Sequence, residues 1–220
     1  MFIFSNLAIS LDGKIATQSR EHFPLGTKED LKQMLVLRKQ SDAILFGAST
    51  LRAYQKPCKV KDASPPIYNI IVSQGCESIN PQWPFFTSNE IRRILFHSKD
   101  VDPSLKKELE KSSTLIRVDN SKPMGTQIVE LLKKFEINRL LVEGGGEVIW
   151  YFSQENLIDE YNVTITPRIL GGKNAPTLVE GLGFKPDDVL NLKLKSCKTI
   201  NNEIFIVYSK TGSKGRILPE

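Results

Sequence analysis

Short runs of apolar residues alternate with amphipathic segments along the first two thirds of the chain. The apolar runs have the length and the side-chain types of strands, and they read FIFSNLAISL, DAILFG, IYNIIVS, RRILFHS, TLIRV and RLLVE. The segments between them, such as SLKKELEKS and GTQIVELLKKFE, have the charge and the apolar spacing of helices. Strands separated by helices predict an α/β fold with a mainly parallel sheet and helices on both faces.

One predicted helix lies within residues 26–40, GTKEDLKQMLVLRKQ. Thr27 and Asp30 have the spacing of a capping box, in which the Thr27 side chain accepts a bond from a first-turn amide and Asp30 reaches back. At helical spacing, one face of this helix carries Leu31, Met34, Leu35 and Arg38.

The last third of the chain changes character, because three strand-like runs follow one another closely. They read DEYNVTITPRIL, VLNLKLKSCKTI and EIFIVYSK, and Asn201-Asn202 predicts a turn between the last two. We expect these strands to be antiparallel additions to the same sheet. No linker is long enough to separate two domains, so residues 1–220 are predicted to form a single domain, with about 209–220 as a loose tail.

Composition narrows the class of protein. The chain has 220 residues and a net charge of +5, and its scattered lysines favour a solvated surface that attracts small anions over a nucleic-acid interface. No apolar run approaches the roughly 18 residues of a membrane helix, and the N-terminus does not resemble a signal peptide. Three cysteines without CxxC spacing and only two histidines predict reduced thiols in a cytoplasmic protein and no metal centre.

Two strand ends carry glycine-rich turns. Residues 140–150, LLVEGGGEVIW, run from a strand through three glycines into a helix, and residues 45–50, LFGAST, repeat that order with one glycine. Bare backbone amides at a helix N-terminus favour a phosphate, and glycine lets a pyrophosphate lie against the backbone. A tight strand-to-helix turn without a ligand is the alternative for either turn, but two of them in one sheet favour a dinucleotide cradle.

A third strand end reads AISLDGKIAT, residues 8–17. Asp12-Gly13 is a strong turn signal, so a hairpin is one interpretation of this segment. The alternative is that Asp12 and Lys14, held at a strand end, bind a phosphorylated sugar.

Four segments, SLDGKIAT, LRKQSDAILFGAST, LLVEGGGE and DEYNVTITPRILGGKNAPT, occur in this order. Together they resemble the pyrimidine reductases of riboflavin biosynthesis, which stand alone or form the C-terminal half of a bifunctional deaminase–reductase. The resemblance covers nearly the whole chain, from about residue 5 to about residue 208. It implies a dihydrofolate-reductase-like fold, a three-layer α/β/α sandwich, with bound NADPH and usually a homodimer. Residues 165–170 are the candidate edge for pairing with a second copy.

The resemblance also implies roles for single residues. The implied cofactor contacts are Ala8, Gly47, Thr50, Ser73, Gly144, Gly145 and Gly146. The implied substrate contacts are Arg38 and Glu143, with Lys14 near the sugar of the substrate.

The chain departs from the family on the substrate side. Tyr54 stands where the family commonly has the first aspartate of an Asp-Asp-Pro segment, and Lys61 lies near an expected arginine. Both are candidate substrate-binding residues, Lys61 as a point charge for a phosphate; a solvated loop is the alternative for Lys61. His22 falls where a substrate-binding serine is common.

The implied reaction reduces a ribosylamino-pyrimidine 5′-phosphate, in its uracil or its 2,5-diaminopyrimidinone form. The ribose ring opens to an imine, and NADPH gives a hydride to C1′. Glu143 and Asp12 are the candidates for favouring the charge of the protonated imine, and Lys14 for holding a sugar oxygen or transferring a proton. Structural roles stay open for Glu143 and Asp12. The competing functions are a reductase of the same fold for a pterin or another imine, and a nucleotide- or RNA-binding protein without enzymatic activity.

Overall fold

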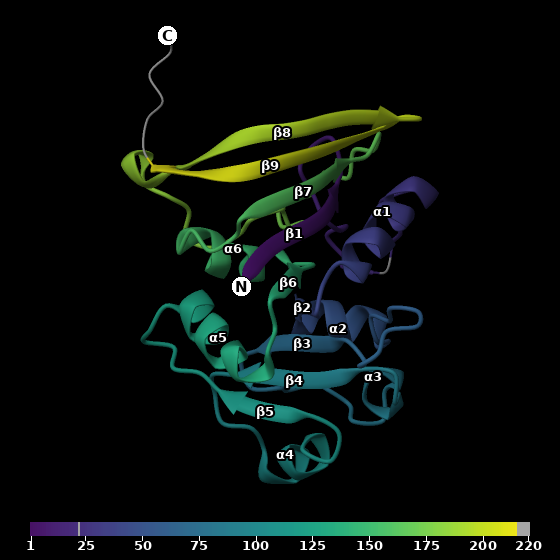
Figure 1. The fold of residues 1–220 in the computed structure, drawn as a ribbon, viewed down its shortest axis with the longest axis vertical. Helices are drawn as coiled ribbons and strands as arrows, with labels where there is room; N and C mark the ends of the chain where they lie inside the picture. The colour runs from purple at the N-terminus through teal and green to yellow at the C-terminus, as the bar shows by residue number, and fades with distance from the viewer. Residues whose placement is uncertain (22, 215–220) are drawn as a thin grey trace.

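The computed structural model describes residues 1–21 and 23–214, with the side chains of 212–214 excepted. Its centre is a twisted sheet of nine strands in the order β5-β4-β3-β2-β6-β1-β7-β9-β8, which runs from the bottom to the top of Figure 1. The strands are β1 Phe2–Ile9, β2 Ala43–Gly47, β3 Tyr68–Ser73, β4 Arg92–His97, β5 Thr114–Arg117, β6 Arg139–Val142, β7 Glu160–Ile165, β8 Leu190–Ile200 and β9 Glu203–Lys214.

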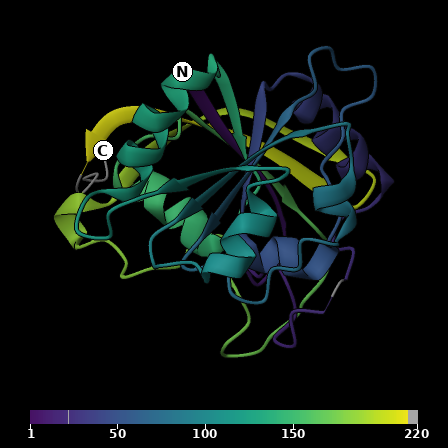
Figure 2. The same ribbon diagram turned by 90° about the horizontal axis from the view of Figure 1, so that it is seen from below.

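Helices cover both faces of this sheet, as the view from below shows (Figure 2). The helices are α1 Lys28–Lys39, α2 Ala48–Tyr54, α3 Pro84–Thr87, α4 Pro103–Leu109, α5 Met124–Leu132 and α6 Gly146–Gln154, with short 3-10 helices η1 Lys133–Phe135 and η2 Pro186–Asp188. In the described part of the chain, no helix is long and apolar enough to cross a membrane.

The parallel and antiparallel parts of the sheet follow the predicted order. Strands β1 to β7 pair in parallel with their neighbours. Strand β9 is antiparallel to β7, and β8 is antiparallel to β9. Because strands β1 to β7 all run in the same direction, their carboxyl ends lie at one edge of the sheet, and this edge carries both glycine-rich turns.

Alternating side chains divide the interior into two apolar cores, one on each face. Leu37 of α1, Leu51 of α2 and Phe85 of α3 pack on one face against residues that include Phe4 and Phe46. On the other face, α5 and α6 pack through Ile128, Leu132, Ile149 and Phe152. The helix-covered sheet confirms the predicted three-layer α/β/α sandwich.

Several local predictions need correction. Strand β9 continues to Lys214, so residues 209–214 are sheet and not the start of a loose tail, and residues 215–220 lie outside the described residues. Strand β7 is paired on both sides, by β1 and β9, and the Thr166 amide donates to Ile9 O. Residues 165–170 therefore do not offer the free edge that pairing with a second copy needs.

Only one of the two bonds of the predicted capping box forms at the start of α1. The Thr27 side chain accepts from the Glu29 amide. The Thr27 amide and hydroxyl donate to Glu203 of β9, at 2.8 and 2.6 Å, so Glu203 takes the reciprocal place predicted for Asp30. The predicted apolar face is also largely uncovered, because Leu31 and Leu35 are about half exposed and Leu37 is the buried residue of α1.

Candidate functional site

The two glycine-rich turns lie side by side at the carboxyl edge of the sheet. Strands β2 and β6 are neighbours, and Leu45 aligns with Val142. Beyond the strands, the Gly47 amide donates to Gly144 O and the Glu143 amide donates to Leu45 O, both at 2.9 Å. Helices α2 and α6 begin directly after these turns, so two helix N-termini face the same edge.

The three glycines of residues 144–146 do different things. Gly144 has φ +94°, and a Cβ there would lie 2.8 Å from Leu7 Cδ2, so this position requires glycine for the turn itself. A Cβ on Gly146 would meet Thr177 O at 2.6 Å, so the protein covers that position. A Cβ on Gly145 would have no neighbour within 4 Å. The open cradle expected of three glycines is therefore centred on Gly145.

The first backbone amides of α6 are unpaired within the described part of the chain. Gly145 is the N-cap residue and makes no side-chain cap, and the peptide bond between Gly144 and Gly145 is cis. The amides of Gly145, Gly146 and Glu147 donate no hydrogen bond within the described residues. Backbone donors next to open space fit the diphosphate of a dinucleotide.

Beside this turn, Glu143 and Arg38 form a bidentate ion pair. Arg38 Nε and Nη2 donate to the two Glu143 carboxylate oxygens at 2.7 and 2.6 Å, and both side chains are largely buried. Burial by itself lowers the pKa of Arg38, but the hydrogen bonds and the charge of Glu143 outweigh it and raise that pKa. The pairing brings together the two predicted substrate residues, from α1 and from the end of β6.

Cys58 and Asn69, which the sequence analysis missed, complete this cluster. The Cys58 amide donates to Asn69 Oδ1 at 2.8 Å, and Asn69 Nδ2 donates to Cys58 O at 3.0 Å. This clamp places Cys58 Sγ 4.0 Å from Glu143 Oε2. Burial, and then the charge of Glu143, raise the pKa of Cys58 to about 12. The available signal was the single asparagine within the apolar strand run IYNIIVS.

Tyr54 lies near this cluster, whereas Lys61 does not reach it by any described contact. The pKa of Tyr54 is raised by burial of its hydroxyl and by the charges of Cys58 and Glu143, although the residue as a whole is half exposed. Lys61 is exposed, as the solvated-loop alternative expects, and the neighbouring Lys59 pairs with Glu90. His22 lies outside the described residues.

Asp12 and Lys14 tie the first turn to a later loop. Asp12 Oδ1 accepts from the Ser10 hydroxyl and the Leu170 amide, and Oδ2 accepts from the Gly171 amide. These bonds lower the pKa of Asp12 to about 2, the Ser10 bond most strongly. Lys14 Nζ donates to Ala175 O at 3.2 Å. The contacts favour the turn interpretation of Asp12, and the catalytic roles of both residues stay predictions.

The remaining predicted cofactor residues also lie at or near the carboxyl edge of the sheet. Ala8 of β1 aligns with Thr164 of β7, and Gly47 aligns with Val72, one residue before Ser73. Ser73 accepts from the Cys76 amide at 3.2 Å, which gives it a turn role as well. Thr50 is half-buried in the first turn of α2 and does not cap that helix.

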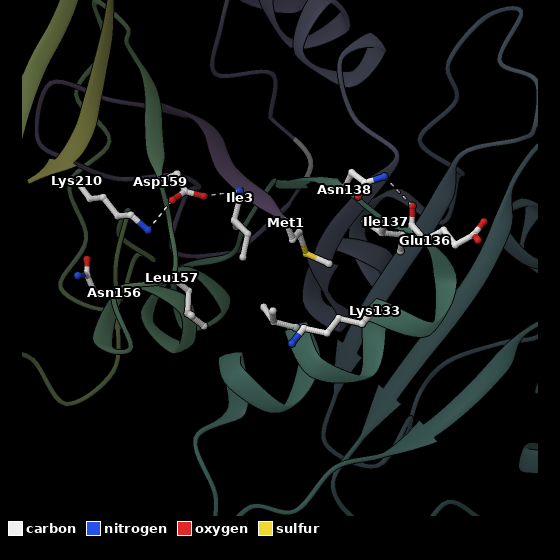
Figure 3. A pocket seen from close by; sticks show the side chains of 11 residues that line it. Met1, Ile3, Lys133, Glu136, Ile137, Asn138, Asn156, Leu157, Asp159 and Lys210 are labelled. Carbon is white, nitrogen blue, oxygen red and sulfur yellow. Dashed lines mark hydrogen bonds and ion pairs between the residues drawn. The ribbon is translucent and has the colours of Figure 1, made fainter. Parts of the chain in front are cut away.

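A separate cavity of about 300 Å³ lies at the opposite, amino edge of the sheet (Figure 3). Its lining includes Met1, Lys133, Asn138, Asp159 and Lys210. Its two lysines are paired, Lys210 with Asp159 and Lys133 with Glu130. The cavity therefore lies away from the glycine turns and shares none of the predicted site residues.

Comparison with known proteins gives concordant results. The family model described as the RibD C-terminal domain matches residues 1–206. A relative in Methanothermobacter thermautotrophicus, "2,5-diamino-6-ribosylamino-4(3H)-pyrimidinone 5′-phosphate reductase", is 29% identical over 214 residues, which are 96% of this chain and 99% of the relative.

Two solved structures show the fold. Acinetobacter baumannii RibD aligns with a TM-score of 0.77 at 18% identity, over 96% of this chain and 58% of that longer chain. Dihydrofolate reductase from Enterococcus faecalis, a complex with NADP(H), aligns with a TM-score of 0.55 at 12% identity, over 96% of each chain. The fold is therefore dihydrofolate-reductase-like, as predicted.

Proposed function

The chain belongs to the RibD C-terminal domain family, and from this premise we propose that it is an NADPH-dependent pyrimidine reductase of riboflavin biosynthesis. The proposed substrate is 2,5-diamino-6-ribosylamino-4(3H)-pyrimidinone 5′-phosphate, by analogy with the reductase of Methanothermobacter thermautotrophicus. The alternative substrate is the 5-amino-uracil form. The product carries a ribityl group in place of the ribosyl group.

One observation supports the cofactor most directly: the amides of residues 145–147, which donate to none of the described residues, lie beside the open space at Gly145. A diphosphate at this position would receive backbone hydrogen bonds and would meet no Cβ. The neighbouring turn at Gly47 and the end of β1 at Ala8 lie along the same edge, where a dinucleotide would extend. When bound, NADPH supplies the hydride for the reduction.

The side chains around Glu143 support the substrate half of the proposal. The Glu143 carboxylate is held in one orientation by Arg38, so it presents a fixed negative charge to a cationic, protonated imine. Tyr54 is the last residue of α2, and Lys56, Lys59 and Lys61 lie in the segment after it, where their positive charges would attract the substrate phosphate. A preorganised site of this kind acts by positioning and by charge.

The test uses the purified full chain with NADPH. Oxidation of NADPH is followed by absorbance with the diaminopyrimidinone ribotide, with the uracil ribotide, and with a pterin. Turnover of either ribotide supports the proposal, and the ratio of the two kcat/KM values identifies the preferred pyrimidine. Turnover of the pterin alone would assign the chain to another reductase activity.

Cofactor binding is tested separately by fluorescence titration of NADPH. Gly145→Asp places a carboxylate against the proposed diphosphate position and should abolish binding. The matched control is Asn156→Asp, which adds the same charge after α6 at the amino side of the sheet, where the backbone already has φ +54°. Equal loss of binding in both variants would mean that charge acts nonspecifically.

A further inference from the structure

The α1-covered face of the sheet is apolar at one end of α1 and polar at the other. Phe4 packs in the same core as Leu37, near the C-terminus of α1. Side chains alternate along a strand, so Asn6 and Ala8 face the same side as Phe4. In β7, Asn162 aligns with Asn6 and Thr164 aligns with Ala8, and both are buried. These side chains therefore form a polar patch on the α1 side of the carboxyl halves of β1 and β7.

The Asn6 side chain belongs to this polar patch. Its relative exposure is 8%, and its side-chain amide makes no hydrogen bond within residues 1–21 and 23–214. Its polar atoms are not among the fully enclosed unpaired ones of the described residues, which are Ser5 Oγ and Ser113 Oγ, so they still reach solvent. The Asn6 amide is therefore a donor and an acceptor that a polar ligand at this patch can bond to.

Asp30 lies in the first turn of α1 and reaches this polar patch at Thr164. It is hydrogen-bonded with the Thr164 hydroxyl, and a Cβ on Gly26 would collide with its carboxyl group. The charged groups around it are Glu203 from β9 and Glu143 from the end of β6, both negative. Arg38, the nearby cation on its own helix, is engaged by Glu143. Asp30 forms no ion pair among the described residues.

The environment of Asp30 disfavours its charged form. Burial first, and then the charges of Glu203 and Glu143, raise the pKa of Asp30, against the Thr164 bond, which lowers it. A carboxyl group that holds its proton beside a bound sugar can give that proton to a sugar oxygen.

We propose that Asp30 is the proton donor that opens the ribose ring of the substrate, and that the Asn6 amide binds the substrate beside it. This inference rests on the proposed function. In the step, the C1′–O4′ bond breaks and its electron pair stays on O4′, which takes the Asp30 proton. The exocyclic nitrogen lone pair forms the C1′=N bond, and C1′ is then ready to accept the hydride. The Asp30 carboxylate recovers its proton from solvent, so one hydride and one proton are added overall.

The first variant is Asp30→Asn, which keeps the shape of the side chain and removes the acidic proton. We expect kcat to fall by at least about 100-fold, the lower end of general acid catalysis, with NADPH affinity unchanged. Wild-type kcat/KM should fall as the pH rises through the Asp30 pKa. This falling part of the pH profile, the pH limb, should be absent in Asp30→Asn. Asp100→Asn, which changes an exposed acid paired with Arg117, is the control and should keep wild-type activity.

A second readout needs no cofactor. Ring opening interconverts the two anomers of the ribosylamine, so exchange NMR without NADPH should show faster interconversion with wild-type protein than with Asp30→Asn. Stability gives a third readout. Because the folded pKa is raised, ionised Asp30 destabilises the fold as pH rises above about 4, so Asp30→Asn should melt higher than wild type at pH 7 and lose this gain below pH 4.

The outcomes separate the two proposals. If wild type reduces neither ribotide, the proposed function fails first. If wild type is active and Asp30→Asn keeps its kcat and its pH limb, the proton-donor inference is wrong. Asn6→Leu should raise KM without loss of thermal stability; an unchanged KM would remove Asn6 from the substrate site.

Discussion

Gly144 and Gly145 are adjacent, yet the structure predicts opposite consequences for the same substitution. In Gly144→Ala the new Cβ would sit 2.8 Å from Leu7 Cδ2, at a backbone φ of +94°. The left-handed backbone costs about 1–2 kcal/mol for an L-residue, and crowding of a packed core adds roughly 1–3 kcal/mol. We expect Gly144→Ala to lower the free energy of unfolding by about 2–5 kcal/mol.

Gly145→Ala should leave the fold intact. Gly145 has φ −49° and open space around the position of a Cβ, so the change in free energy of unfolding should stay within about 1 kcal/mol. The methyl group would, however, occupy the place of the diphosphate. We expect NADPH to bind at least tenfold more weakly, a loss of about 1.4 kcal/mol.

The assay pairs urea unfolding with NADPH fluorescence titration for both variants and wild type. The expected pattern is a stable Gly145→Ala protein with weak binding and a destabilised Gly144→Ala protein. Wild-type NADPH affinity in a fully folded Gly145→Ala protein would refute the placement of the cofactor at this turn.

Three further predictions follow from the ion pairs, the first turn and the surface. Arg38→Met leaves the Glu143 carboxylate buried without a cation, so the free energy of unfolding, measured by urea denaturation, should fall by about 3 kcal/mol. An unchanged free energy of unfolding would show that Glu143 is solvated. In the folded protein the pKa of Asp12 is lowered to about 2, so ionised Asp12 stabilises the fold above about pH 4, and this stabilisation is lost as the pH falls towards 2. Asp12→Asn should remove this part of the dependence of the melting temperature on acid pH. As a homodimer, the protein should give roughly twice its 24.8 kDa chain mass in light scattering, whereas a monomer at micromolar concentration would reject the dimer.

The strand and helix periodicities predicted the sheet well, because each strand is either continuously apolar or alternating and most helices are amphipathic. The glycine turns were predicted from their strand–glycine–helix order, and Arg38 and Glu143 were identified singly through the resemblance, without the ion pair that joins them. The sequence analysis missed contacts between distant segments: Cys58 with Asn69, and Thr27 with Glu203. No local pattern encodes these, since each depends on the order of strands in the sheet. The half-exposed face of α1 was mispredicted for the same reason, because spacing identifies a stripe but not what covers it.

Helix α1 is held at both ends by carboxylates from the sheet. The same carboxylates act on the pKa of Asp30 through their charges. Glu203 binds Thr27 at the N-terminus, and Glu143 binds Arg38 near the C-terminus. Glu203 also raises the pKa of Asp30 through its charge. Glu203→Gln should therefore lower the Asp30 pKa, and the fall of kcat/KM with rising pH should begin at a lower pH than in wild type.

The same variant weakens the cap of α1, so the free energy of unfolding should fall by about 1 kcal/mol. The control is Glu90→Gln, which removes a surface carboxylate paired with Lys59 and should leave the pH profile unchanged. A cap-only role for Glu203 would lower stability and leave the pH limb where it is. A shifted pH limb would show instead that the Glu203 carboxylate raises the proton affinity of Asp30. Such an effect would give a functional reason for the burial of Glu203 at this end of α1 without a cation beside it among the described residues.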